Sequence, residues 1–411
     1  AGTVAALKVP MTGMPGMVAI LNGCGGLASA LVALAYLWVH VVEPAKIGTL
    51  AALLGFSQSS TLALSILLGG LTFSGSVVAY LKVQEKVSDL PVLFAGRHLV
   101  NTALFAGSLA AGASLAYVAI SPSLGALLSL VLLAVSLILG VLMVIPIGGA
   151  DMPVVISLLN ALSGVAASAT GFIFNNDLLI IAGALVGASG LILTQIMCTA
   201  MNRSLANVVF GGFGAQEGTA GAARSEYKNV RFASAEDAAV LLEIANSVVI
   251  VPGYGMAVAQ AQHIVHELSD LLQSRGAKVH YAIHPVAGRM PGHMNVLLAE
   301  ANVPYDQLIE MEAINPEFKD TDVVIVIGAN DVVNPAGLKN PGSPIYGMPI
   351  LEVFHARSVF VVKRSLGAGF AGIKNELFEY PNTMMLLGNA RQVVQEILGY
   401  LKSVRSLGKV G

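Results

Sequence analysis

Six long apolar runs limit what this chain can fold into. Each is long enough to cross the roughly 30 Å hydrocarbon layer of a bilayer as a helix, which takes about 20 residues. Hydrophobic residues make up 55% of the 411 positions and charged residues only 11%, a balance that excludes an ordinary soluble protein. The sequence therefore predicts an all-α transmembrane helix bundle, with spans at residues 14–39, 60–81, 99–120, 124–145, 153–174 and 178–201.

The few charges among the spans predict their orientation. With a cytoplasmic N-terminus, most basic residues lie on the inner side, as the positive-inside rule prefers. These are Lys8, Lys82, Lys86, Arg97 and Arg203, against Lys46 on the outer side. The chain beyond the last span is then cytoplasmic. The formal net charge is -2, and the charged residues do not form blocks of one sign. This pattern excludes a nucleic acid as a partner.

Small residues within the spans carry weaker signals. Gly183 and Gly187 form a small-xxx-small pair, which indicates either a close helix contact or a chance spacing. Cys24 and Cys198 stand alone in apolar runs, so we interpret them as small buried hydrophobes rather than as a disulfide or metal pair. The chain begins at Ala1 near a glycine-rich turn, and we expect that an N-terminal segment has been cut or processed.

The pattern changes after the last span. Residues 211–223 read GGFGAQEGTAGAA, which is typical of a flexible tether. Beyond it, short β-rich runs alternate with helix-length segments, which predicts an α/β Rossmann-like domain with a six-stranded parallel sheet. We expect a transmembrane domain at 1–203, a linker at 204–229 and a nucleotide-binding domain at 230–411. The predicted strands are 247–251, 278–283, 307–311, 322–327, 358–362 and 383–387.

The turn after the first predicted strand carries a nucleotide-binding pattern. Gly253, Gly255 and Val258 form G-x-G-x-x-V, and a helix is expected to follow and to continue through Leu272. Glycines in this context permit a tight turn and the close approach of a pyrophosphate to the free N–H groups of a helix N-terminus. A glycine turn in another kind of α/β protein is the alternative interpretation.

Two strand ends indicate which dinucleotide is bound. An NAD site normally has Asp or Glu at the end of the second strand, whereas residues 278–286 here read KVHYAIHPV. At the end of the fifth strand, Lys363, Arg364 and Ser365 offer an ammonium, a guanidinium and a hydroxyl to a 2′-phosphate, although a solvated basic pair is the alternative. The pattern favours NADP(H), in a flipped orientation because the basic cluster is not at the second strand.

Several longer runs resemble one protein family. They are residues 11–21 (MTGMPGMVAIL), 149–155 (GADMPVV), 284–306, 328–331 (GAND), 346–353 (YGMPILEV) and 363–372 (KRSLGAGFAG). With them, nearly the whole chain resembles the beta-type subunit of the proton-translocating nicotinamide nucleotide transhydrogenases. The resemblance implies hydride transfer between NAD(H) on a partner subunit and NADP(H) held here in the flipped orientation. No catalytic acid, base or nucleophile is then expected, because the cofactors carry the chemistry.

The resemblance also assigns residues to the NADP(H) site. Gly253, Tyr254, Gly255 and Val258 would lie at the pyrophosphate, and Lys363, Arg364 and Ser365 at the 2′-phosphate. Phe370 stands where the family often has Tyr, so it offers no hydroxyl. The other implied positions are Val286, Ala287, Gly288, Arg289, Met290 and Pro291 beside the nucleotide; Gly328, Ala329, Asn330, Asp331 and Val332 near its nicotinamide; Gly367, Ala368, Gly369 and Phe370 in a lid that runs from Gly367 to Gly372; and Gly347, Met348, Leu366, Asn389 and Ala390 elsewhere in the pocket.

The implied complex is larger than this chain. Its expected partners are the NAD(H)-binding alpha-type subunit and that subunit's membrane helices. The whole complex is expected to be a homodimer in the lipid bilayer of the bacterial inner membrane, or of the mitochondrial inner membrane in a eukaryote. Relative to the family, the chain is expected to begin two or three helices late.

Polar side chains inside the spans suggest a route for protons. Asn22 and Asn160 are expected roughly 10 to 12 Å deep from the cytoplasmic side, and Ser136 and Gln195 at a similar level from the other side. Asp151, in a cytoplasmic turn, would relay protonation to cofactor binding. Packing hydrogen bonds, or a solvated turn for Asp151, are the alternatives. Some family members have His in place of Asn22, whereas the spans of this chain have no histidine near their middles. The resemblance implies that the titrating group then comes from a helix of the partner subunit.

Two other interpretations concern a histidine pair and the function of the whole chain. His263 and His266 stand one helical turn apart without a third ligand, so we expect a solvated helix face and no metal site. A transporter or channel gated by a cytoplasmic nucleotide-sensing Rossmann domain is the alternative function. Such a pore is expected to have a filter or re-entrant segment, and an NAD sensor an acid after the second strand; the sequence shows neither.

Overall fold

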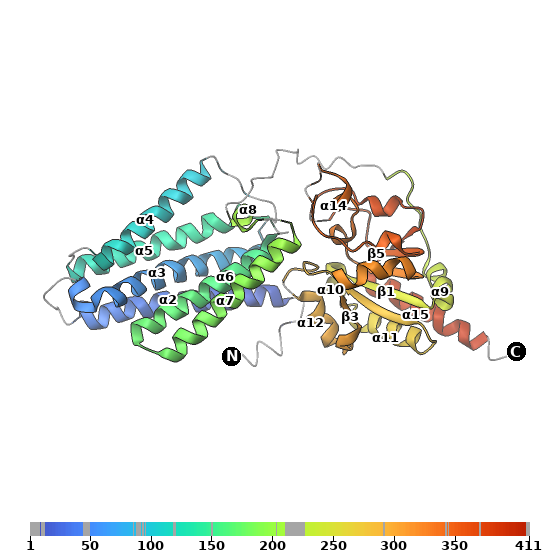
Figure 1. Cartoon of the computed structure of the whole chain (residues 1–411), viewed down its shortest axis with the longest axis horizontal. Helices are drawn as coiled ribbons and strands as arrows, with labels where there is room; N and C mark the ends of the chain where they lie inside the picture. The colour runs from blue at the N-terminus through green and yellow to red at the C-terminus, as the bar shows by residue number, and fades with distance from the viewer. Residues whose placement is uncertain are drawn as a thin grey trace. The chain divides into compact units, whose positions relative to one another are not determined.

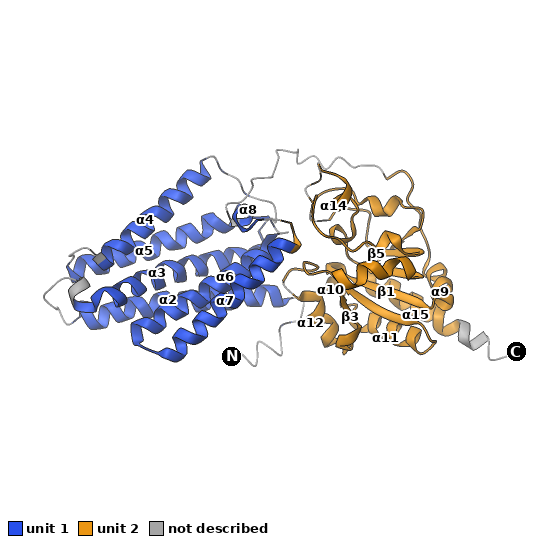
Figure 2. Ribbon diagram, in the orientation of Figure 1, with its two compact units in different colours: residues 1–199, 203–213 blue, residues 200–202, 214–411 orange. Residues whose placement is uncertain are grey.

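The structure, a computed structural model, divides into two compact units: residues 1–199 with 203–213, and residues 200–202 with 214–411 (Figure 2). It describes residues 9, 13–43, 50–84, 86–87, 92, 94, 96–117, 121–148, 151–202, 204–209, 227–290, 292–341, 343, 345–369 and 371–407. Lys8, Lys46, Arg203, Pro291, Phe370 and the predicted tether at 211–223 lie outside the described residues. Of the predicted linker, the short helix α8 (Leu205–Val209) is described.

Six helices in the first unit are long and apolar enough to cross a membrane, which confirms the six predicted spans (Figure 1). α3 is the most buried of them and α4 the least. Pro15, Pro122 and Pro153 lie in the first turns of three helices, where the missing N–H group would have no helical partner anyway. The helices are α2 (Met14–Leu37), continued by the π-helix η2 (Trp38–Val42), α3 (Leu50–Val83), which kinks at Gly55, α4 (Arg97–Tyr117), α5 (Pro122–Val144), α6 (Met152–Phe174) and α7 (Asp177–Ala200).

Glycines bring helices of this bundle into close contact. A Cβ on Gly26 of α2 would stand 2.8 Å from the carbonyl oxygen of Gly69 of α3. A Cβ on Gly164 of α6 would stand 2.8 Å from the carbonyl oxygen of Gly183 of α7 and would also meet the backbone of Gly187. Missing side chains let helix backbones approach where hydrophobic burial does not drive association. Gly183 and Gly187 therefore make a close helix contact, one of the two interpretations of their spacing.

Replacing Gly183 with alanine is expected to weaken the α6–α7 contact. The new Cβ would meet the backbone nitrogen of Ser168, and overpacking of this kind costs about 1–3 kcal/mol. Gly107 of α4 offers a matched control, because a Cβ there meets nothing within 4 Å. Thermal unfolding in detergent should show a lower midpoint for Gly183→Ala than for Gly107→Ala. Equal midpoints would contradict the prediction.

The second unit is built on a six-stranded parallel sheet flanked by helices, as predicted (Figure 1). The strand order is β3-β2-β1-β4-β5-β6, and each predicted strand is found to within one residue at either end. All five residues of β4 are buried, as expected for a central strand covered on both faces. The strands are β1 (Ser247–Pro252), β2 (Lys278–Ile283), β3 (Leu308–Glu310), β4 (Val323–Ile327), β5 (Ser358–Lys363) and β6 (Thr383–Leu387).

The core of this unit lies on the sheet, where alternate residues of β1, β4 and β5 pack with buried aromatic side chains from the connections, Phe318 and Phe378. α9 (Ala235–Ile244) starts with a capping box between Ser234 and Asp237. The other helices are α11 (Gln262–Gln273), α12 (His293–Glu300), α13 (Met311–Ile314), α14 (Ala336–Lys339), α15 (Ala390–Leu407) and the 3-10 helices η4 (Tyr305–Gln307), η5 (Asn315–Asp320), η6 (Asp331–Val333), η7 (Val353–His355) and η8 (Glu376–Glu379).

The single helix expected from the glycine turn through Leu272 is wrong. α10 (Tyr254–Val258) ends after five residues, and a residue with φ 48°, Gln260, separates it from α11. The N–H groups of residues 260 and 261 each donate at 3.0 Å to carbonyl oxygens of α10, which is the bonding pattern of a Schellman cap. Met256 and Ala261 are fully buried, so an apolar contact stabilises this break.

Candidate functional site

The strand order places the topological switch point, where open α/β sheets have their crevice, between β1 and β4. From β1 the chain continues to β2 and β3 on one side, and from β4 to β5 and β6 on the other. The connections leave in opposite directions at this point, and open α/β sheets bind ligands there, outside the carboxyl ends of the strands. The predicted nucleotide residues at 253–258, 286–290, 328–332 and 363–369 all follow the carboxyl end of a strand, so the fold gathers them at one edge.

Two glycine turns meet at this crevice. The N–H of Gly255 donates to the carbonyl oxygen of Gly328 at 3.0 Å. A Cβ on Gly255 would stand 2.7 Å from the Cα of Gly328, and a Cβ on Gly253 would overlap the backbone of Ala329. Gly328 itself has φ 69°, a conformation that favours glycine. The turns after β1 and β4 therefore form a cradle with no side chain between the backbones, which is the form that a phosphate-binding turn requires.

The loop after β2 contacts the start of α10. The guanidinium of Arg289 lies over the ring of Tyr254, 4.4 Å from Cζ to the ring centroid, in a cation–π contact. The ring of His293 lies 6.2 Å from the same ring. Arg289 is buried although its side chain is charged. The β2 loop is thus joined to the first residue of α10, and the structure brings these predicted residues together.

Two histidines, His284 and His293, hold the β2 loop. The Nδ1 atom of His284 accepts from the N–H of Val286 at 3.2 Å, and its Nε2 bonds to the carbonyl oxygen of Pro349 at 2.9 Å. The Nδ1 atom of His293 accepts from the N–H of Arg289 at 3.0 Å. An imidazole that accepts at Nδ1 must be neutral. Burial lowers the pKa of both histidines to about 4, and the charge of Arg289 adds to this effect at His293.

The β2 loop is expected to open in acid. Because the folded pKa values lie below the ordinary value of 6.5, stability is complete above pH 6.5 and is lost as the pH falls towards 4, at about 1.4 kcal/mol per pH unit for each histidine. Hydrogen exchange of the Arg289 amide, corrected for its intrinsic rate, should show falling protection over this range. In His293→Asn, whose side-chain oxygen is an acceptor that does not titrate, that protection should fall about half as steeply, because only His284 still titrates. Parallel losses in the two proteins, or in the β4 amide of Ile325, would contradict the prediction.

Side-chain hydrogen bonds join the segments that follow β4 and β5. The carboxylate of Asp331 accepts from the N–H of Ala371 at 2.9 Å. The fully buried Asn375 donates to the backbone and side-chain oxygens of Asn330, at 3.0 and 2.9 Å. The N–H of Asn375 in turn donates to the Tyr227 hydroxyl at 3.2 Å. The described part of the predicted lid is therefore bonded to the turn that carries Asp331.

The basic cluster lies at the end of β5. The ammonium of Lys363 donates to the carbonyl oxygen of Gly367 at 2.7 Å and lies over the ring of Phe378, 5.0 Å from its centroid. Burial lowers the pKa of Lys363 to about 8, against the nearby charge of Asp331, which raises it. Arg364 and Ser365 are exposed. One cation therefore holds the start of the lid segment, and the two residues after it face outwards, where an anion can reach them.

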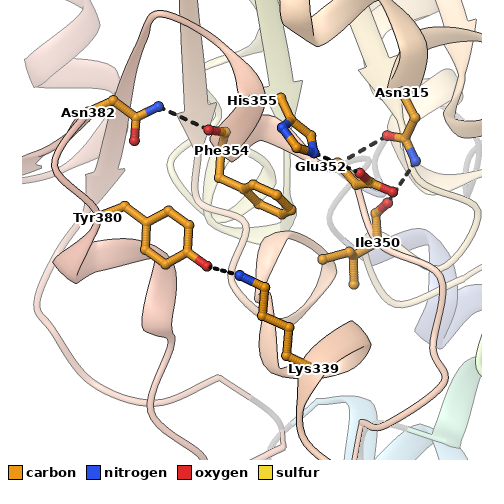
Figure 3. Close-up of polar contacts among 8 residues, drawn as sticks. All are labelled: Asn315, Lys339, Ile350, Glu352, Phe354, His355, Tyr380 and Asn382. Carbon is orange, nitrogen blue, oxygen red and sulfur yellow. Dashed lines mark hydrogen bonds and ion pairs between the residues drawn. The ribbon is translucent and has the colours of Figure 1, made fainter.

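Polar contacts hold the residues that follow Gly347 and Met348 (Figure 3). Asn315 donates to the carbonyl oxygen of Ile350 at 2.9 Å and accepts from the N–H of Glu352 at 3.1 Å. The same figure shows the Lys339 ammonium bonded to the Tyr380 hydroxyl, and Asn382 bonded to the carbonyl oxygen of Phe354. The side chain of Met348 packs in the hydrophobic cluster of Ala336, Ile345 and Ile350.

The remaining predicted residues lie at different places. Val258 is exposed at the end of α10. Val332 and Leu366 pack against the core of the sheet, and Ala287, Met290 and Ala329 are buried. The side chain of Asn389 accepts from the N–H of Arg391 in the first turn of α15. The preceding residue, Gly388, donates its N–H to the carbonyl oxygen of Lys363 at 2.8 Å, which joins Asn389 and Ala390 to the basic cluster.

In the helix bundle, the structure brings one predicted proton-route residue to another helix. The buried Asn22 of α2 donates to the carbonyl oxygen of Ile156 of α6 at 3.2 Å, one turn before the half-buried Asn160. Ser136, fully buried on α5, donates to Leu133 of its own helix. Gln195 is exposed on α7. The residues predicted to lie at one depth therefore have different surroundings: a contact with another helix, a bond within one helix, and the exposed surface.

The structure gives the surroundings of several charged or titratable side chains, which residue spacing in the sequence could not predict. Lys82, counted as an inner-side charge, is fully buried, and its ammonium donates to the carbonyl oxygens of Ile145 and Ile147 at 2.7 Å each, at the end of α5. Asp151 is half-buried at the N-cap of α6. Of the histidine pair on α11, His266 lies 3.5 Å from Asp270, one turn along the helix. Cys198 is buried as expected, whereas Cys24 is exposed on the bundle.

Sequence reasoning missed His284, His293 and Asn375. His284 and His293 lie within the run 284–306, and the glycines between them, Gly288 and Gly292, were a signal of a folded-back loop. Gly288 has φ 109° and lies directly against the ring of His293. Nothing in the sequence around Asn375 shows that it reaches Asn330, 45 residues away.

Two comparisons with known proteins give the same family. The family model for the NAD(P) transhydrogenase beta subunit matches residues 1–399. The chain is 51% identical over 408 residues to the NAD(P) transhydrogenase subunit beta of Rhodospirillum rubrum, covering 97% of this chain and 84% of the relative; the protein of the same name from a strain of that species matches equally. The chain belongs to the NAD(P) transhydrogenase beta subunit family. It is therefore an oxidoreductase component, and its apolar helices make it a membrane protein.

Proposed function

We propose that this chain binds NADP(H) at the carboxyl edge of its sheet, and that it couples hydride transfer with NAD(H) to proton movement through its helix bundle. One observation supports this most: the glycine turns after β1 and β4 meet at the switch point, and the exposed Arg364 and Ser365 follow β5. Residues 284–290, which follow β2, contain no acid for a ribose 2′-hydroxyl. Family membership supports the same function.

Each group at the edge has a role in this proposal. The cradle of Gly253, Gly255 and Gly328 takes the pyrophosphate, and Arg364 and Ser365 take the 2′-phosphate, so the dinucleotide lies in the flipped orientation. Asp331 and Lys363 hold the lid segment through Ala371 and Gly367. When bound, NADP(H) supplies the hydride donor or acceptor itself. The chain's own residues position it and exclude water, so no side chain needs to act as acid, base or nucleophile.

Proton movement is assigned to the bundle. Asn22 joins α2 to α6, and Asn160 follows one turn later on α6, whose N-cap is Asp151. In our proposal the amides line the route and the titrating group comes from the partner's helices. One proton moving through a potential of about 150 mV releases roughly 3.5 kcal/mol, enough to shift a nucleotide equilibrium by a few hundredfold.

The assembly completes the proposal. The partner is the NAD(H)-binding alpha-type subunit with its membrane helices, and the whole complex is a homodimer. It lies in the inner membrane, with the nucleotide domain on the cytoplasmic side. The domains are those expected from the sequence: a transmembrane domain at 1–203, a linker at 204–229 and a nucleotide domain at 230–411.

The decisive experiment reconstitutes the full chain with its alpha-type subunit in vesicles. Hydride transfer from NADPH to an NAD analogue is followed by absorbance, and the internal pH by a dye. We expect the two signals to rise together and an uncoupler to remove only the pH change. A channel gated by nucleotide sensing would instead give an NADP(H)-dependent ion flux without hydride transfer. Proton pumping by this chain with only a soluble NAD(H) domain would overturn the assignment of the titrating group to the partner's membrane helices.

A further inference from the structure

The segment 227–233 attaches the chain to the sheet before α9 begins. Tyr227 is half-buried, and both it and Val230 pack against the hydrophobic core of the sheet. Residues 231–233 lie along β6, where they form backbone hydrogen bonds of 2.8 and 3.1 Å with Met385. This segment therefore has a fixed position in the nucleotide unit, although no motif in the sequence singles it out.

Tyr227 contacts the connection between β5 and β6 through both its ring and its hydroxyl. Its ring centroid lies 5.7 Å from that of Phe378 and 4.9 Å from the ammonium of Lys374. The hydroxyl accepts from the backbone N–H of Asn375 at 3.2 Å. Burial raises the pKa of Tyr227 above its ordinary value of 10.0, so the hydroxyl is uncharged at neutral pH. One side chain thus contacts three residues of a connection that also contains the predicted lid.

Asn375 extends the first of these contacts to the turn after β4. Asn375 is fully buried, and its carboxamide is bonded on both sides. The amide donates to the backbone and side-chain oxygens of Asn330 at 3.0 and 2.9 Å, and the side-chain oxygen accepts from the N–H of Leu377 at 3.0 Å. Buried polar groups keep such partners because losing one is costly. The backbone of Asn375 cannot move away from Tyr227 without disturbing these bonds to Asn330, which precedes Asp331.

Phe378 extends the second contact to the end of β5. The ring of Phe378 is fully buried, and the ammonium of Lys363 lies 5.0 Å from its centroid. A cation at this distance from an aromatic ring is attracted to it. Lys363 donates in turn to the carbonyl oxygen of Gly367, the first residue of the predicted lid, at 2.7 Å. Tyr227 therefore contacts both residues through which the turn after β4 and the lid are held.

We propose that Tyr227 is a positioning residue for NADP(H), which holds the turn after β4 and the lid segment in place and so slows the release of the nucleotide. It acts through Asn375 and Phe378 and not by contact with the nucleotide. The proposal rests on the proposed function, because it requires NADP(H) at this edge of the sheet.

The test measures how fast the full chain in detergent releases NADPH. NADPH-loaded protein is mixed with excess NADP⁺, and the decay of NADPH fluorescence gives the dissociation rate. Tyr227→Phe keeps the ring and removes only the acceptor of the Asn375 N–H. Its release should be about fivefold faster, the factor that corresponds to one buried hydrogen bond. Tyr227→Leu also loses the ring contacts with Lys374 and Phe378, and its release should be about thirtyfold faster.

Hydrogen exchange shows whether the effect follows the proposed route. In Tyr227→Phe the amide of Asn375 should lose protection, whereas the amide of Ile325 in β4 should exchange as in wild type. Tyr400→Phe is the matched control, because Tyr400 is 43% exposed in the second half of α15. This control should change neither the release rate nor the protection of either amide.

The outcomes separate a positioning role from a packing role. A wild-type release rate in Tyr227→Phe would overturn the inference, whatever happens at the Asn375 amide. Faster release with an unchanged Asn375 amide would place the effect on another route, and faster release with an equal loss of protection at Ile325 would mean general loosening. Either result would also overturn the inference while the proposed function stands. If wild-type protein does not bind NADPH, the proposed function fails, and this inference fails with it.

Discussion

Replacing Arg364 with alanine is expected to weaken NADP(H) binding about a hundredfold while leaving NAD(H) binding nearly unchanged. A bidentate guanidinium–phosphate pair contributes about 2–3 kcal/mol, which corresponds to that factor. Arg364 is exposed at the end of β5, so its removal should not disturb the fold. Calorimetric titration of the full chain with both dinucleotides measures the effect, and Arg364→Lys should recover only part of the loss.

Arg357→Ala supplies the matched control. Arg357 immediately precedes β5, at the opposite edge of the sheet, and forms an exposed ion pair with Asp322 at 2.8 Å. Removing it changes the net charge by the same amount but should not change NADP(H) affinity. Equal losses for Arg364→Ala and Arg357→Ala would mean that long-range charge, and not a phosphate contact, controls binding. A loss shared by NADP(H) and NAD(H) would place Arg364 away from the 2′-phosphate.

Replacing Gly255 with alanine should remove NADP(H) binding to a similar degree by a different cause. The new Cβ would stand 2.7 Å from the Cα of Gly328, and both atoms belong to backbone turns that cannot move aside cheaply. Separating the turns after β1 and β4 would open the cradle and break the 3.0 Å hydrogen bond between them. We expect about a hundredfold weaker binding and a loss of about 1–3 kcal/mol of stability.

The control for this change is Gly399→Ala on α15, because a Cβ there meets nothing within 4 Å. Alanine also has the higher helix propensity, so this variant should be as stable as wild type or slightly more so. NADP(H) titration and thermal unfolding should be run on both variants. Wild-type affinity in Gly255→Ala would show that the two turns adapt, and the phosphate cradle would then need another explanation.

The acid-dependent loop and the lid bonds are connected through the same edge. His284 bonds to Pro349, next to Met348, while Asp331 and Lys363 hold the ends of the segment 367–371. The Asp331 bond joins the turn after β4 to the segment after β5, the Lys363 bond lies within that segment, and the His284 bond joins the loop after β2 to the segment before β5. Any change of protonation that breaks one of them alters the position of a loop at the crevice, which is the kind of link that coupling to a proton route requires.

Local patterns in the sequence were sufficient for the fold class. Spans need only continuous apolar length, and parallel strands buried on both faces need only short β-branched runs, so both could be read from neighbouring residues. The break at Gln260 could not, because it depends on the burial of Met256 and Ala261 in the folded domain. The surroundings of the polar residues in the spans could not be predicted either. The depth of a residue in the membrane does not say whether its side of the helix faces a neighbouring helix.

The sequence by itself determined the six spans, the six strands, and the glycine and basic residues at the strand ends, because period, length and turn chemistry are local properties. Only the tertiary structure decided which of these residues meet. It placed Gly255 against Gly328, buried Lys82 on two carbonyl oxygens of the α5 end, and left Gln195 exposed. Contacts between residues far apart in the chain depend on strand order and helix rotation, which no local pattern encodes.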